Sequence, residues 1–79
     1  MILEMVLWEV PEPVRGSNHR LKYSLFYGNE TARLIGYDNE AGKGDHRHYG
    51  SFEEPYHFTT AKRLLGDFLE DVRAIRRRG

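Results

Sequence analysis

An apolar stripe near the C-terminus constrains the fold of this chain more than any other feature. Large aliphatic and aromatic residues recur there at steps of three and four, which is the period of an amphipathic helix. They are Leu64, Leu65, Phe68, Leu69, Val72 and Ile75. Thr59 or Thr60 can cap the first turn, and Arg63 and Asp67 are spaced to pair across one turn. This helix needs an apolar surface to cover it, and the rest of the chain offers only strands.

The residues before this helix have the composition and alternation of β-strands. The expected extended segments are residues 2–10, 19–27, 31–38 and 45–58. Polar, glycine-containing turns separate the last three segments, at 28–30 and 39–44, which favours hairpin connections. We therefore predict one α+β domain spanning residues 1–79, with a four-stranded antiparallel meander sheet and a C-terminal helix packed on one face.

The length and composition of the chain indicate that it associates with a partner. A domain of 79 residues buries only about 60% of the surface of its unfolded chain. The chain has 0 cysteines, which excludes disulfides and thiolate metal sites. Reinforcement must then come from another chain, so we expect a homodimer or a complex with a partner protein.

Charge and hydropathy narrow the functional classes. Lys plus Arg and Asp plus Glu are both 12, which argues against a general basic coat for nucleic acid but allows a local basic site. The chain has no apolar run long enough to cross a membrane. Its apolar N-terminus carries Glu4 and Glu9 and lacks the basic start of a signal peptide. We therefore expect a cytoplasmic protein with no membrane association.

The segment YDNEAGKGDHRHYG, residues 37–50, concentrates titratable side chains that no core requires. On a regular strand His46 and His48 share a face, about 6.6 Å apart along the strand axis, whereas Arg47 and Tyr49 point the other way. That spacing allows a phosphate to lie between two imidazoles. The segment is therefore a candidate site for chemistry on a phosphodiester.

The predicted chemistry is RNA cleavage without a metal ion or other cofactor. A neutral imidazole can take the proton of a ribose 2′-hydroxyl, and a protonated one can give a proton to the departing 5′-oxygen, because histidine ordinarily titrates near pH 6.5. Which of the two histidines is the acid stays open. The other predicted site residues are Lys43 and Arg47 for phosphate, Asp38 or Asp45 to orient an imidazole, and Tyr49 to stack a base.

Two other interpretations of these residues stay open. His46 and His48 with a carboxylate, and a further ligand from His19 or His57, could hold a metal ion. Alternatively, the histidines are ordinary surface residues of a non-catalytic module that inhibits a target protein by docking. A catalytic pair needs a cleft with a basic neighbour, whereas a docking module needs a flat apolar patch.

The strings LIGYDNEAGKGDHRHYG, EEPYHF and LLGDFLEDV, within residues 34–72, resemble the TumE-like toxins of prokaryotic toxin–antitoxin modules. The family motif falls on Asp38, Asn39, Lys43, Gly44, Asp45, His46, Arg47, His48 and Tyr49. The resemblance implies a toxin whose partner is a helix-turn-helix antitoxin, so part of its surface should be a protein interface. By analogy with other small toxins, RNA is the expected target.

Overall fold

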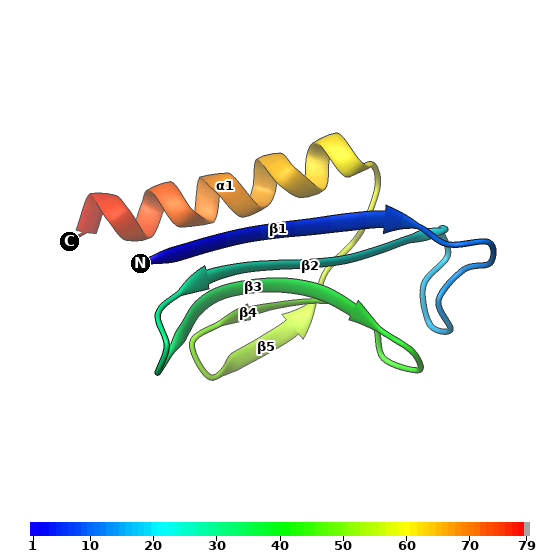
Figure 1. The fold of residues 1–79 in the computed structure, drawn as a ribbon, viewed down its shortest axis with the longest axis horizontal. Helices are drawn as coiled ribbons and strands as arrows, with labels where there is room; N and C mark the ends of the chain where they lie inside the picture. The colour runs from blue at the N-terminus through cyan, green and yellow to red at the C-terminus, as the bar shows by residue number, and fades with distance from the viewer. Residues whose placement is uncertain (79) are drawn as a thin grey trace.

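A computed structural model describes residues 1–78 and contains a single sheet covered on one face by a helix (Figure 1). Each strand pairs antiparallel with the next along the chain, so the sheet order is β1-β2-β3-β4-β5. The elements are β1 Ile2–Glu9, β2 Leu21–Gly28, β3 Arg33–Glu40, β4 Gly44–Tyr49, β5 Phe52–Pro55 and α1 Ala61–Arg78. The α+β meander with a C-terminal helix is confirmed.

The predicted number of strands is wrong, because the last extended segment folds back on itself. Tyr49 pairs with Phe52, so residues 50 and 51 form a two-residue hairpin loop between β4 and β5. Gly50 occupies its first position with φ 60°, as a type II′ turn requires. The Gly50–Ser51 pair is itself a hairpin signal, and it divides the predicted single strand 45–58 in two, so the sheet has five strands and not four.

The turn between β2 and β3 is longer than predicted. The Asn29 side-chain oxygen accepts hydrogen bonds from the backbone N–H groups of Thr31 and Ala32, at 2.9 and 2.8 Å. This Asx-type bonding keeps residues 29–32 out of the ladder. β3 therefore runs from Arg33 to Glu40, so it starts and ends two residues later than the predicted segment 31–38.

Helix α1 begins and packs as its sequence predicts. The Thr60 hydroxyl oxygen accepts a hydrogen bond from the Arg63 N–H at 3.1 Å, which makes Thr60 the N-cap. The predicted pair between Arg63 and Asp67 forms at 3.1 Å. Leu64, Phe68 and Val72 are fully or almost fully buried. The stripe therefore packs on the sheet.

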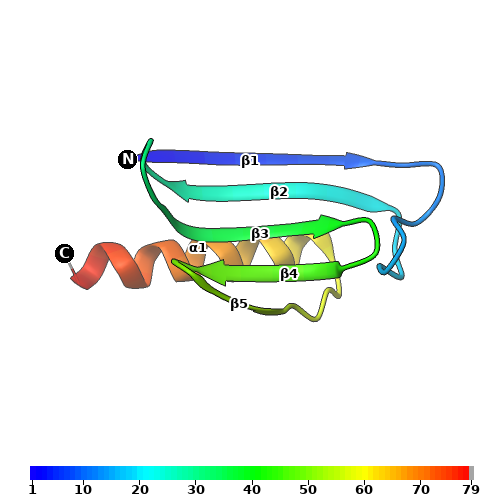
Figure 2. The same ribbon diagram turned by 90° about the horizontal axis from the view of Figure 1, so that it is seen from below.

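The core lies between α1 and the middle of the sheet. β2 and β3 contribute Tyr23, Leu25, Tyr27, Ile35 and Tyr37, all buried. The Tyr37 ring meets Phe68 edge-on at 5.8 Å between ring centroids. Figure 2 shows α1 behind β3 and β4, with β1 at the far edge of the sheet. No helix within residues 1–78 is both long and apolar enough to span a membrane.

Candidate functional site

Strand β4 divides the predicted site residues between the two faces of the sheet. Its pairing with β3 shows the alternation: Tyr37 of β3 is opposite Arg47, and Asp38 of β3 is opposite His46. Tyr37 lies in the core, so Arg47 and its alternate neighbours Asp45 and Tyr49 face the helix. His46 and His48 face the side that α1 leaves uncovered, here called the open face. The predicted sharing of one face by the two histidines agrees with this alternation.

On the open face, two adjacent rows of residues cross the sheet through the histidines. One row consists of Val6, Ser24, Asp38, His46 and Pro55, and the next of Glu4, Phe26, Gly36, His48 and Glu53. Directly opposite side chains in such rows are about 4.5–5.5 Å apart at Cβ. The rows therefore gather both histidines, three carboxylates and one aromatic ring on one face of the sheet.

His48 lies between two carboxylates on this face. Its Nε2 is 3.5 Å from Asp38 Oδ1 and 3.7 Å from Glu53 Oε2, and its side chain is 12% exposed. A protonated His48 is ion-paired with both. Asp38, predicted to orient an imidazole, is therefore next to one of the two histidines.

His46 is oriented by the backbone of its own strand. Its Nδ1 is 2.9 Å from the Gly44 carbonyl oxygen. A carbonyl oxygen only accepts hydrogen bonds, so Nδ1 carries the proton and the neutral ring has its lone pair on Nε2. Gly44 has φ 77°, and a Cβ there would lie 2.6 Å from the Gly16 carbonyl oxygen. Only glycine fits this backbone position, which fixes the hydrogen bond that orients His46.

Arg33 is a cation of the open face that the sequence did not reveal. A Cβ built on Gly36 would lie 2.6 Å from Arg33 Cδ and 3.4 Å from Arg33 Nη1. The Arg33 side chain therefore crosses the space that Gly36 leaves free, and Gly36 is the direct partner of His48. A glycine inside a strand is the only signal of this close approach.

On the helix face, the Asp45 carboxylate is bound by the loop that precedes β2 and by β2 itself. This carboxylate accepts hydrogen bonds from Ser17 Oγ at 2.7 Å, His19 Nε2 at 2.8 Å and the Tyr23 hydroxyl at 2.6 Å. The His19 ring also stacks on Phe58, with centroids 3.7 Å apart. The imidazole that Asp45 orients is thus that of His19.

The alternation also separates the histidines that the metal alternative would combine. His19 is bound to Asp45 on the helix face, whereas His46 and His48 are on the open face. Among residues 1–78, no group of three or more His, Cys, Asp or Glu side chains is arranged to hold a metal ion.

Tyrosine hydroxyls fasten the helix and the sheet to each other. Tyr37 and Tyr49 both donate to Asp71 on α1. Burial, and then the hydrogen bond to Asp71, raise the pKa of both hydroxyls above the ordinary tyrosine value. Tyr49, predicted to stack a base, is therefore tied to the helix. Its ring also lies 5.4 Å from the Arg47 guanidinium carbon.

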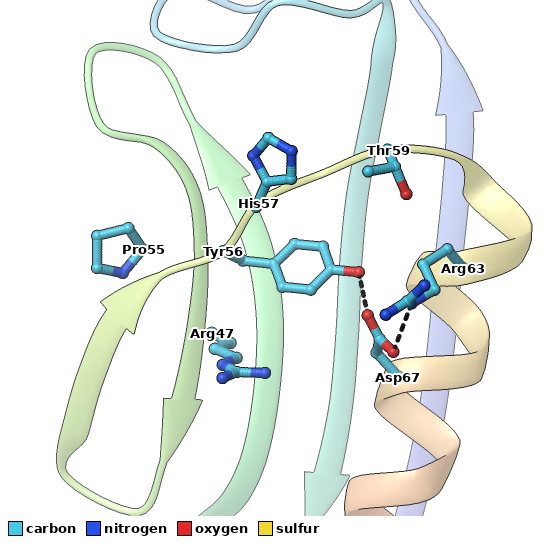
Figure 3. Close-up of a pocket in the computed structure, with 7 residues that line it drawn as sticks. All are labelled: Arg47, Pro55, Tyr56, His57, Thr59, Arg63 and Asp67. Carbon is cyan, nitrogen blue, oxygen red and sulfur yellow. Dashed lines mark hydrogen bonds and ion pairs between the residues drawn. The ribbon is translucent and has the colours of Figure 1, made fainter.

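Two adjoining hollows, of about 360 and 410 Å³, lie where β5 leads into α1, and both are lined by Pro55, Tyr56 and His57. Arg47 lines the first, where Figure 3 shows the Tyr56 hydroxyl pointing at Asp67. Lys43 lines the second.

Arg47, which lines the first hollow, is not free. Its Nε donates to Glu54 at 2.7 Å. Burial lowers the pKa of Arg47, but hydrogen bonds from its guanidinium to Tyr37 and Glu54 outweigh burial and raise it. The predicted phosphate ligands Lys43 and Arg47 thus lie away from the histidine pair.

The match to a protein family covers nearly the whole described chain. A family model described as Toxin TumE matches residues 2–76. Comparisons with curated proteins and with solved structures gave no match. The matched residues include all five strands and most of α1, together with both faces of β4. The chain therefore belongs to the TumE toxin family.

Proposed function

We propose that the chain is the toxin of a toxin–antitoxin pair and that it cleaves RNA on the open face, with His46 as general base and His48 as general acid. One observation supports the assignment more than any other. The contact between His46 Nδ1 and the Gly44 carbonyl leaves Nε2 as the proton acceptor, on the same face as a His48 flanked by two carboxylates. The expected protein partner is a helix-turn-helix antitoxin.

The reaction is an internal transfer of the phosphodiester. His46 Nε2 takes the proton of the ribose 2′-hydroxyl, and the 2′-oxygen attacks the adjacent phosphorus. The bond from phosphorus to the 5′-oxygen breaks, and His48 gives that oxygen a proton. The products are a 2′,3′-cyclic phosphate and a 5′-hydroxyl end, so the step consumes no water and transfers no electrons.

The surroundings of the histidines supply the remaining roles. The Arg33 guanidinium, held over Gly36 beside His48, stabilises the negative charge that develops on the phosphoryl oxygens. Asp38 positions the His48 imidazole. Lys43 binds a phosphate further along the RNA, from the second hollow at the end of the sheet, whereas Arg47 stays paired with Glu54. This reaction needs no metal ion.

A second function, inhibition of a target protein by docking, is favoured by one feature. Apolar side chains of β1 are exposed over most of its length, and large exposed apolar patches are typical of protein interfaces. A docking toxin would act without either histidine, so substitution of the histidines separates the two functions.

The test is to express the His46→Ala, His48→Ala double variant in cells and to map new RNA 5′ ends. The wild-type chain should arrest growth and produce 5′-hydroxyl ends, and the double variant should do neither. Lys62→Ala, at an exposed residue of α1 that lines neither hollow, is the control and should stay toxic. A folded double variant that arrests growth as the wild type does would refute RNA cleavage by these histidines and favour docking.

A further inference from the structure

Strand β1 is an unprotected apolar sheet edge. It runs for eight residues, Ile2–Glu9, and within residues 1–78 it pairs with β2 alone. Six large apolar residues at this end of the chain are exposed: Met1 71%, Ile2 42%, Leu3 42%, Met5 44%, Val6 49% and Trp8 47%. Native edge strands are normally shielded by lysine, proline, bulges or a covering element, because an open edge pairs with other chains. Between Ile2 and Glu9 the strand has none of these.

Strand β1 is exposed on the helix face of the sheet as well as on the open face. Leu3 and Met5 are opposite Tyr27 and Leu25 of the core, so they lie on the helix face. Ile2, Val6 and Trp8 lie on the open face. Helix α1 runs along β3 and β4 and leaves β1 uncovered (Figure 2). A partner that covers this surface must therefore extend the sheet itself, not merely pack on one side.

The backbone groups that a new strand would meet can be identified. The Val10 N–H donates to the Arg20 carbonyl of the neighbouring strand at 2.9 Å. In an antiparallel ladder the direction of these groups alternates along the strand, and the register of β1 with β2 has no shift. The N–H and C=O groups of Leu3, Met5 and Leu7 therefore point to the free edge.

We propose that β1 of a second copy of this chain pairs antiparallel with this edge, with the two-fold axis at Met5. Antiparallel pairing across a two-fold axis keeps both helices on the same face of one continuous sheet. Met5 then faces Met5 of the second copy and exchanges two backbone hydrogen bonds with it. Leu3 faces Leu7 of the second copy, and Ile2 faces Trp8.

The charges of β1 agree with self-pairing in this register. Glu4 and Glu9 are the only charged residues of the strand, and like charges directly opposite destabilise a sheet. With the axis at Met5, Glu4 faces Val6 of the second copy and Glu9 faces Met1. No carboxylate of one copy is then directly opposite a carboxylate of the other. Leu3, Met5 and Leu7 of both copies form one apolar row on the helix face.

The first test is the mass of the purified chain at micromolar concentrations, by light scattering. The wild type should have twice the 9.3 kDa of one chain. Met5→Lys and Met5→Glu should each be monomeric, because they place like charges opposite each other at the axis. Mixing the two variants should restore dimers. Phe52→Lys, at an exposed apolar residue on the other sheet edge, should leave the dimer intact.

A second test reads the register directly. Glu4 and Val6 of the second copy form a non-hydrogen-bonded pair, with Cα atoms about 4.5 Å apart, which a disulfide can span. Because the natural chain has 0 cysteines, Glu4→Cys and Val6→Cys chains should cross-link on oxidation when mixed, and far more slowly when separate. Equal cross-linking in all three samples would overturn the register. A monomeric wild-type chain, even one whose β1 binds an antitoxin, would overturn self-pairing.

Discussion

The two faces of strand β4 differ in how completely their polar groups are used. On the helix face, three donors hold the Asp45 carboxylate at 2.6–2.8 Å. On the open face, His48 has carboxylates only at 3.5 and 3.7 Å, and His46 binds a backbone carbonyl through one nitrogen. A strand of six residues thus has structural polar groups on one side and histidines available to a ligand on the other.

This difference shows why a cluster of titratable residues in a sequence is not one site. Alternation along a strand assigns neighbours to different surroundings, so Asp45 and His46 can have unrelated roles. A carboxylate that already accepts three hydrogen bonds serves the fold, whereas an imidazole with a free nitrogen can exchange a proton. Substitutions on the helix face should therefore change stability, and those on the open face should change activity.

The largest effect on stability should come from the helix side of the comparison. Phe68 is completely buried and meets Tyr37 edge-on. Phe68→Ala should lower the free energy of unfolding by about 3–5 kcal/mol, which is much of the stability of a domain this small. Urea unfolding followed by circular dichroism measures it. An unchanged midpoint would mean that α1 does not pack on β3 as described.

A matched pair of aspartates sharpens the comparison across β4. Asp45→Asn weakens hydrogen bonds to a buried carboxylate and should cost about 1.5–3 kcal/mol of unfolding free energy. Asp38→Asn, on the open face, should cost less than about 0.5 kcal/mol and should slow RNA cleavage instead. Urea unfolding of both variants measures these two values. Equal losses of unfolding free energy would contradict the distinction between the two faces.

Alkaline pH should lower the free energy of unfolding gradually, through the buried tyrosines on the helix face. Burial, and then hydrogen bonds to aspartate, raise the pKa values of Tyr23, Tyr37 and Tyr56 above the ordinary 10.0. The folded chain thus keeps protons that the unfolded chain releases. This stability is fully present below about pH 10 and is lost as pH rises further, by up to about 1.4 kcal/mol per pH unit for each tyrosine. Unfolding curves from pH 8 to 11 measure the slope, and Tyr56→Phe should make it shallower.

Local patterns were enough to predict α1, an N-cap at Thr59 or Thr60, and the shared face of His46 and His48, because each depends on residues close in sequence. The fifth strand does not follow from alternation alone, because its boundary with β4 depends on a two-residue turn at Gly50 and Ser51 within an otherwise extended run. The chain as a single domain stays a prediction, as do the roles of the histidines.

Other parts of the candidate site could not be predicted from sequence patterns. Ser17 and His19 meet Asp45 across 28 and 26 residues of sequence, because tertiary packing of the loop brings them there. Arg33 lies across Gly36, the strand partner of His48, only because Gly36 leaves room for its side chain. The exposure of β1 depends on which strands α1 covers, and periodicity does not contain that information.

The most direct test of the division between the two faces is the rate at which purified His46→Ala and wild-type chains produce 2′,3′-cyclic phosphate ends on RNA. Unfolding curves of the same samples fix the folded fraction. We predict a rate about 10²–10⁴-fold lower for His46→Ala, with unfolding free energy within about 0.5 kcal/mol of the wild type. A folded His46→Ala chain that cleaves RNA at the wild-type rate would contradict the assignment of chemistry to the open face.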